Sequence, residues 1–174
     1  RPMKYLIKLF FCILIFNIPV LADCNYERLS LGTGSEIVKS VYNIDVQIDK
    51  ENFSLSSSSP KGVKGHKICD DNKYDDLNFR FFFIDHTLQL ISIIDNNSEI
   101  NHFENLVNFY GKPTYQRITK NIDGIDDHNW AFSDKDIFLQ IIKQNEEIIS
   151  NIKIIDKNYV SKLNSFEGDD DVLH

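Results

Sequence analysis

The stretch from Phe79 to Pro113 constrains the fold most, because it predicts a strand, a tight turn, a second strand and a helix in direct succession. Residues 79–84 and 88–94 are dominated by Phe, Leu and Ile, which favour strands. Asp85-His86-Thr87 separates the two runs and is typical of a turn. The centre of the chain is therefore expected to be a hairpin that a helix follows.

The expected helix runs from Glu99 to Tyr110. Apolar residues recur in it at helical spacing, at Ile100, Phe103, Leu106, Val107 and Tyr110. Asn97 or Ser98 can cap its first N–H groups, and Gly111 with Pro113 ends it. A helix this short is marginal alone in water, so it is expected to pack on the hairpin.

Residues 1–22 predict a signal peptide. Lys4 and Lys8 supply a positive start, Leu9 to Ile18 is an apolar core, and Val20-Leu21-Ala22 is a small-residue cleavage site. The alternative is a membrane anchor, but the apolar run is shorter than the roughly 20 residues that a span needs. We expect an exported protein, periplasmic or secreted, with no stable membrane span after cleavage.

Charge restricts the partners of the exported chain. Removal of residues 1–22 leaves 16 Lys and Arg against 26 Asp and Glu, a formal charge of −10. Such an acidic domain is a poor nucleic-acid binder, because phosphate contacts need a basic surface. The charge suits a basic protein partner or cations, and a merely solvated acidic surface is the alternative.

Two cysteines remain after the signal peptide, Cys24 and Cys69, since Cys12 lies within it. Two cysteines in an exported chain predict one disulfide. It would tie the mature N-terminus to the loop before the first Phe-rich strand.

The N-terminal third is expected to be less regular than the centre. Residues 23–31 are interpreted as a polar lead-in, Ser35 to Tyr42 as a short helix, and Tyr42 to Ile48 as a strand. The Ser-rich segment 54–62 has the composition of a flexible loop. Residues 70–76 hold four aspartates without the ordered ligand spacing of a calcium loop, so a solvated loop is expected there.

The C-terminal half predicts further strands at 115–119, 128–132, 137–143 and 147–155. We expect one α+β domain over residues 23–163, an antiparallel sheet of about five strands with one or two helices packed on one face. Residues 164–174 are expected to be a disordered acidic tail. No internal repeat is distinct enough to claim. The second face of the sheet needs another layer or a partner.

Catalytic motifs are absent from the sequence. It contains no His-Glu-x-x-His, Gly-x-Ser-x-Gly or Cys-x-x-Cys. His86 falls in a turn and His102 off the apolar helix stripe, so both are expected to be exposed. No catalytic, metal or cofactor residue is assigned, and no cofactor is expected.

Three aromatic residues are candidates for contact with a partner: Phe82, Trp130 and Phe138. Each lies in a predicted strand, where a large aromatic side chain can form part of a binding platform. The alternative is that they belong to the core, where such residues usually lie.

One segment resembles a known group of proteins. The pattern of Leu106, Tyr110-Gly111-Lys112-Pro113-Thr114, then Trp130, and then Ile137 and Leu139 as Ile-x-Leu, resembles that of small exported bacterial proteins of unknown function. Their domains are similar to those of outer-membrane assembly lipoproteins and β-lactamase-inhibitor-like proteins. The resemblance covers residues 79–142, implies a helix-plus-antiparallel-sheet domain in an exported protein, and transfers no functional residue.

These observations together predict an exported, non-enzymatic protein-binding domain. An inhibitor or immunity protein that blocks a basic enzyme is its most specific form, because an acidic surface complements a basic one. The alternatives are a small exported hydrolase with a dispersed His/Asp site, and a structural component of the cell envelope.

Overall fold

The predicted hairpin lies at the centre of the sheet in the computed structural model. β4 (Asn78–Ile84) and β5 (Thr87–Asp95) are joined by Asp85 and His86, both with positive φ. The structure describes residues 24–44, 46–48, 55–58, 62–96, 99–120, 123–144 and 146–162, with the backbone alone at 46–48 and 55–58. The predicted signal peptide, the tail 164–174 and the helix-capping residues Asn97 and Ser98 lie outside the described residues.

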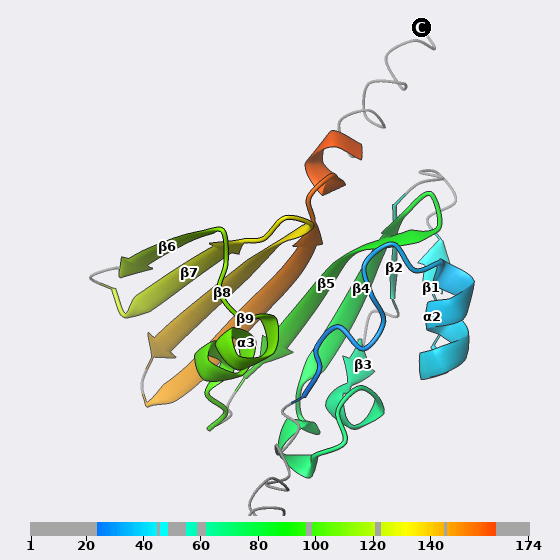
Figure 1. Cartoon of the computed structure of the whole chain (residues 1–174). Coiled ribbons are helices and arrows are strands. Elements are labelled where there is room, and N and C mark those ends of the chain that lie inside the picture. Colours follow the sequence, from blue (N-terminus) through cyan, green and yellow to red (C-terminus); the bar gives the residue numbers. More distant parts are fainter. Residues whose placement is uncertain are drawn as a thin grey trace, which may run out of the picture.

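One antiparallel sheet runs through the described chain in the order β1-β2-β4-β5-β9-β8-β7-β6, with β3 paired beside β4 (Figure 1). The remaining strands are β1 (Val46–Ile48), β2 (Leu55–Ser58), β3 (Val63–Lys64), β6 (Tyr115–Lys120), β7 (Ile125–Ala131), β8 (Lys135–Gln144) and β9 (Glu147–Asp156). The antiparallel α+β class is confirmed. The number of strands is larger than the five expected, nine in the described chain.

Two N-terminal predictions were wrong in detail. The Ser-rich segment 54–62 contains β2, which pairs with β4 at Leu55↔Ile84 and Ser57↔Phe82. Serine-rich composition resembles that of a loop, but the unpaired edge of β4 gives its backbone hydrogen-bond partners. The strand expected from Tyr42 begins only at Val46, because Tyr42 still belongs to α2 (Ser35–Tyr42).

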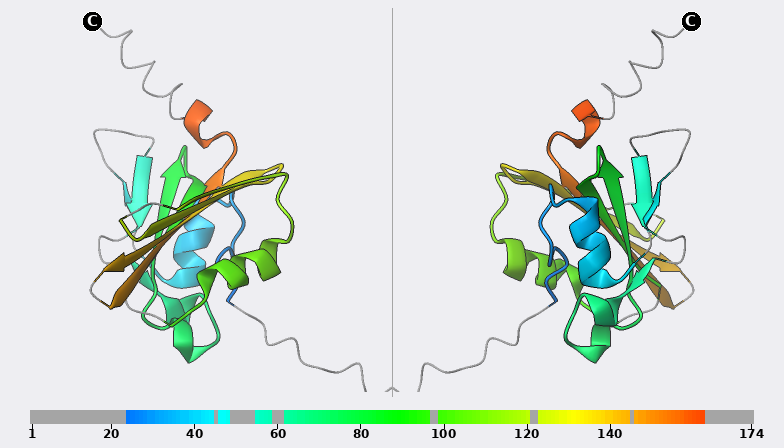
Figure 2. Two further views of the ribbon diagram at one scale, coloured as in Figure 1. Left: turned by 90° about the vertical axis from the view of Figure 1, so that its left-hand side faces the viewer. Right: turned by 90° about the vertical axis from the view of Figure 1, so that its right-hand side faces the viewer.

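The chain contains an internal repeat that sequence analysis missed. Helix α2 is followed by the meander β1-β2-β4-β5, and α3 (His102–Tyr110) is followed by the meander β6-β7-β8-β9. Residues 62–77, with β3 and two short 3₁₀ helices, are an insertion in the first unit. Figure 2 shows the two meanders from the side, where their strands run in clearly different directions because the sheet twists.

The strand register relates the two units by a two-fold axis. β5 pairs with β9 at Ile91↔Ile154, Ser92↔Lys153 and Ile93↔Ile152. The matching sequences are Ile-Ser-Ile-Ile-Asp at 91–95 and Ile-Lys-Ile-Ile-Asp at 152–156. Exchanging these two segments reproduces the same pairs, with Ser92↔Lys153 at the centre. Both helices also end with a tyrosine and then a positive-φ residue, Asn43 or Gly111.

Both helices and residues 24–34 lie on one side of the sheet, which we call the covered face (Figure 1). Its strand residues are almost all buried and apolar: Phe79, Phe81, Ile91, Ile93, Ile137, Leu139, Ile152 and Ile154. Tyr42 of α2 stacks on Phe81, with ring centroids 5.2 Å apart. Helix α3 begins at His102 and not at Glu99, since Asn101 caps it by accepting from the Glu104 N–H at 3.1 Å.

Candidate functional site

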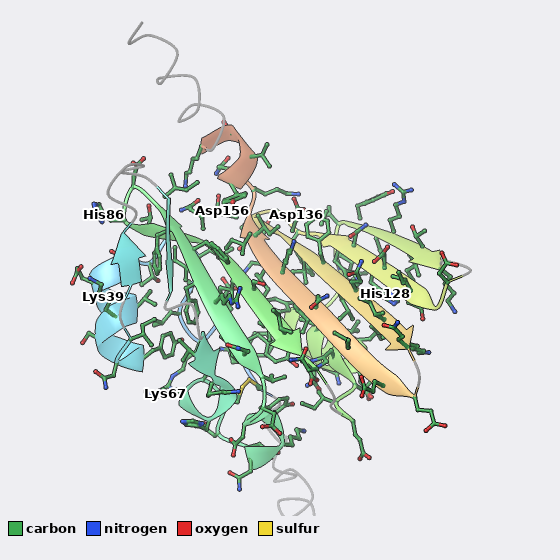
Figure 3. The ribbon with its side chains drawn as sticks, turned by 180° about the vertical axis from the view of Figure 1, so that it is seen from behind. Lys39, Lys67, His86, His128, Asp136 and Asp156 are labelled. Carbon is green, nitrogen blue, oxygen red and sulfur yellow. A yellow bond between two sulfur atoms is a disulfide. The ribbon has the colours of Figure 1, made fainter. Side chains whose placement is uncertain are left out.

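The opposite side of the sheet, which we call the open face, is formed by alternate residues of β4, β5, β9, β8, β7 and β6. Figure 3 shows these strands from behind, with neither α2 nor α3 in front of them. A hollow of about 780 Å³ lies on this face. Its lining side chains come from five strands: Ser92, Ile94, Arg117, Thr119, Asp127, Asn129, Phe138, Gln140, Asn151, Lys153 and Ile155.

The hollow combines an apolar floor with hydrogen-bonding groups, as binding sites commonly do. Ile94 and Ile155 are half-buried, and Phe138 is 39% exposed. Asn129 and Asn151 contribute amide groups beside them. This face therefore offers an apolar contact at Phe138 and several groups that can donate or accept hydrogen bonds.

The charges of the hollow are mostly positive. Arg117 of β6 and Lys153 of β9 are exposed, and neither forms an ion pair with another described residue. The one carboxylate in the hollow, Asp127, accepts a hydrogen bond from the Gln140 amide at 3.0 Å. The hollow thus differs in charge from the acidic chain that carries it.

The three aromatic candidates divide between the two faces. Phe138 lies in the hollow of the open face, and Phe82 of β4 is half-buried on the same face. Trp130 is only 3% exposed on the covered face, where Phe103 of α3 packs against it at 5.6 Å between ring centroids. Trp130 therefore cannot contact a partner in this structure, because α3 covers its strand position.

His128 lies next to Trp130 on the covered face and is also buried. Its ring stacks on Trp130 and contacts Phe103, with centroids 5.5 and 5.0 Å apart. Burial lowers the pKa of His128, and the nearby Asp126 opposes this shift only in part. Its Nδ1 has no hydrogen-bond partner among the described residues. We therefore expect the ring to be neutral near pH 7.

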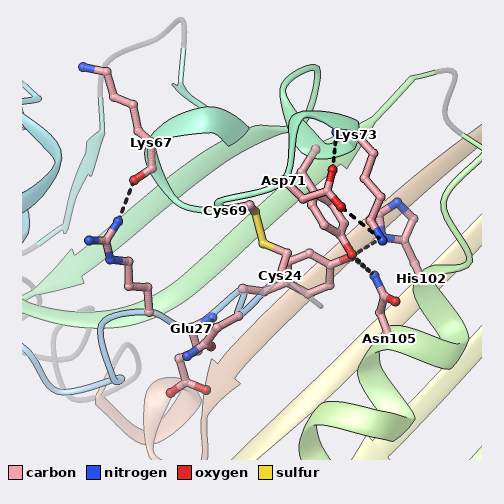
Figure 4. The surroundings of a disulfide bond; sticks show 12 residues. Cys24, Glu27, Lys67, Cys69, Asp71, Lys73, His102 and Asn105 are labelled. Atoms are coloured by element: carbon pink, nitrogen blue, oxygen red, sulfur yellow. Dashed lines mark hydrogen bonds and ion pairs between the residues drawn. A yellow bond between two sulfur atoms is a disulfide. The ribbon is translucent and has the colours of Figure 1, made fainter. Parts of the chain in front are cut away.

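A buried polar network connects α3 to the sheet and to the N-terminal segment. His102 Nε2 lies 2.6 Å from Asp95 Oδ2, and His102 Nδ1 lies 2.6 Å from the Tyr26 hydroxyl. The Asn105 amide donates to the Tyr74 hydroxyl at 2.7 Å and to the Tyr26 hydroxyl at 3.3 Å. Figure 4 shows His102 and Asn105 pointing from α3 toward this segment.

The prediction of an exposed His102 was wrong, since the residue is 2% exposed. The apolar stripe alone places it outside the core, but Asp95 and Tyr26 satisfy both ring nitrogens and permit burial. An Asp–His–Tyr series can pass protons in an enzyme, but Asp95 and Tyr26 are also 2% exposed. This network orders the fold by joining α3 to β5 and to the N-terminal segment, and two of its members, Asp95 and Asn105, also line a hollow beside α3.

The N-terminal segment is part of the core and not the polar lead-in expected. The predicted disulfide between Cys24 and Cys69 is present and joins the segment to the insertion. Glu27 accepts from the Lys135 ammonium at 2.7 Å and from the Tyr110 hydroxyl at 3.2 Å, so it connects to the second unit. Burial lowers the pKa of Lys135, but the carboxylates of Glu27 and Asp134 together outweigh this effect and the pKa is raised overall.

Six acidic residues in the insertion and around the start of α3 lie away from the open face. Asp70, Asp71, Asp75, Asp76, Glu99 and Glu104 belong to the insertion and to the start of α3, and we call this set the acidic end. A second hollow of about 650 Å³ is lined by Asp76, Glu99, Glu104 and Lys73, together with Asp95 and Asn105 of the buried network. Neither this hollow nor the one on the open face is lined by a histidine.

In the part of the chain that the structure describes, no group of three or more His, Cys, Asp or Glu side chains is arranged to hold a metal ion. No helix in the same residues has the length and apolar character to cross a membrane.

Comparison with known proteins gives no assignment. No protein family, curated protein or solved structure matches this chain. The resemblance to exported lipoprotein-like and inhibitor-like domains therefore stays a prediction, and the site must be judged from its own geometry.

Proposed function

We propose that this chain is an exported, non-enzymatic domain that binds another protein through its open face. The observation that carries the proposal is a sheet face that neither α2 nor α3 covers, with a hollow of about 780 Å³. A concave surface that combines apolar side chains with a few hydrogen-bonding groups is typical of binding sites. Phe138 is the apolar anchor, and Phe82 extends the same face.

Export is part of the proposal. A disulfide persists in oxidising compartments, so the Cys24–Cys69 bond fits a periplasmic or extracellular location. An inhibitor or immunity protein against an enzyme is the most specific form of this function, because such proteins act by occupying a surface and need no catalytic group of their own.

Affinity capture tests the proposal. Residues 23–174, oxidised and purified, would be used as bait against the envelope and secreted fractions of the source organism. We expect a stoichiometric protein partner that the wild type retains and Phe138→Asp loses. Phe109→Asp is the matched control, because Phe109 is 45% exposed on α3, away from the open face.

The outcomes separate the alternatives. A partner that Phe109→Asp loses and Phe138→Asp retains would place the interface on the helices and contradict the proposal. Recovery of the chain in a large constitutive envelope complex, insensitive to both substitutions, would favour the structural alternative.

A further inference from the structure

The open face differs from the rest of the molecule in charge. The full chain has 19 Lys and Arg against 26 Asp and Glu, a formal charge of −7. The hollow nevertheless presents Arg117 and Lys153 against one carboxylate, Asp127, whose oxygen already accepts from Gln140. The two cations have no ion-pair partner in the described chain.

We infer that the segment of the partner that docks on the open face is acidic. This inference rests on the proposed function and reverses the partner charge that the composition of the whole chain suggests. Carboxylates of the docked segment would pair with Arg117 and Lys153, while an apolar side chain between them contacts Phe138.

Local charges determine this contact because salt screens distant ones. The Debye length is about 8 Å at physiological ionic strength, so exposed charges farther away contribute little. The acidic end is built from the insertion and the start of α3, and none of its residues lines the hollow on the open face. The carboxylate of Asp136, diagonal to Lys153 on this face, is paired with Lys157 at 2.6 Å, so a carboxylate bound beside Lys153 still meets cations first.

Comparison of the two units supports a specialised open face. Covered-face positions related by the two-fold axis keep the same character, as in Ile91 and Ile152 or Ile93 and Ile154. Open-face positions differ, and Ser92 in the first unit corresponds to Lys153 in the second. The two cations that line the hollow thus both come from the second unit.

A second copy of this chain is a poorer occupant. Face-to-face contact of two copies would bring Arg117 and Lys153 of both into one interface, where like charges repel. An acidic segment of a different protein avoids this repulsion.

Two simple polymers test the inference directly. Full-length 15N-labelled protein would be titrated with poly-L-glutamate and with poly-L-lysine of equal length. We expect poly-L-glutamate to shift the amide resonances of the open-face strands saturably, and poly-L-lysine to shift those of the acidic end. Poly-L-lysine shifting the open face would overturn the inference.

Charge reversal supplies the matched comparison. Arg117→Glu with Lys153→Glu should weaken poly-L-glutamate binding by about tenfold or more. Lys39→Glu with Lys67→Glu changes the net charge equally and should leave that binding unchanged, since both lysines lie off the open face (Figure 3). Equal weakening by both pairs would show a net-charge effect only and contradict the inference.

The captured partner distinguishes the two proposals. If Phe138→Asp abolishes capture but the Arg117 and Lys153 reversal does not, the open face is the site and the acidic inference is wrong. If neither changes capture, the proposed site itself fails.

Discussion

The two faces of one sheet show how differently the same strands can be constrained. On the covered face, alternate residues are apolar or satisfied by a buried network, as Ile91 and Ile93 or Asp95 with His102. On the open face, the neighbouring positions Ser92 and Ile94 line a polar and apolar hollow. Packing limits what the covered face can contain, while the open face is free to carry recognition groups.

Adjacent phenylalanines provide the strongest test of this comparison. Phe81 is 1% exposed beneath Tyr42, whereas Phe82 points to the other side of the sheet. Phe81→Ala should reduce the free energy of unfolding by about 3–5 kcal/mol because it leaves a cavity. Phe82→Ala should cost about 1 kcal/mol, and urea unfolding of both variants measures the difference. Equal costs would mean that the open face is packed in solution.

Removal of the disulfide tests how much the bond between the N-terminal segment and the insertion stabilises the covered face. Cys24→Ala with Cys69→Ala opens a loop with a sequence separation of 45. The chain-entropy estimate for such a loop is about 3–4 kcal/mol. Thermal unfolding of this variant and of the wild type would measure it, with reductant added to the wild type as a second route to the same state. If neither the variant nor the reduced wild type unfolds at a lower temperature, the disulfide does not stabilise the fold through the N-terminal segment.

The buried network should have a smaller but clear effect. His102→Leu removes hydrogen bonds to Asp95 and Tyr26, so we expect a loss of about 2 kcal/mol in unfolding free energy. His66→Leu is the control, because His66 is exposed in the insertion and should change stability by about 0.5 kcal/mol or less. Similar losses of unfolding free energy for the two histidine variants would show that the hydrogen bonds of His102 to Asp95 and Tyr26 do not stabilise the fold.

The smallest expected effect is on the pH dependence of the free energy of unfolding. Burial lowers the pKa of His128 in the folded state below its usual value of 6.5. The unfolded state then binds the proton first, so His128 contributes stability above about pH 6.5 and that contribution is lost as pH falls toward the folded pKa. His128→Gln should reduce the slope of stability against pH in this window, and His66→Gln, at an exposed site, should not. An unchanged slope in both variants would contradict the assignment.

Local patterns in the sequence predicted the local structure well. The helix at Ser35 to Tyr42, the β4–β5 hairpin and the Cys24–Cys69 disulfide are all present. Each depends on residues close in sequence or, for the disulfide, on the small number of cysteines. The end of α3 at Tyr110 was likewise signalled by Gly111.

Features that depend on distant partners were not predictable in the same way. His102 is buried because Asp95 and Tyr26 meet it in space, and a helical wheel cannot show either. The cations of the hollow come from separate strands, so Arg117 and Lys153 have no common sequence signal. The internal repeat did leave a signal in the two Ile-x-Ile-Ile-Asp segments, which are short enough to be overlooked.

The seam between β5 and β9 also has a consequence for how the chain reaches its fold. Within each unit the strands pair mainly with their neighbours in sequence, but this seam joins residues as far apart as Leu90 and Ile155. Closing so long a loop costs more chain entropy than forming a hairpin, and non-local pairing slows folding. Pairing of the two meanders at Ser92 and Lys153 is thus the step expected to limit the rate of folding. Until this pairing occurs, each half has an edge strand whose backbone hydrogen-bonding groups are exposed to solvent.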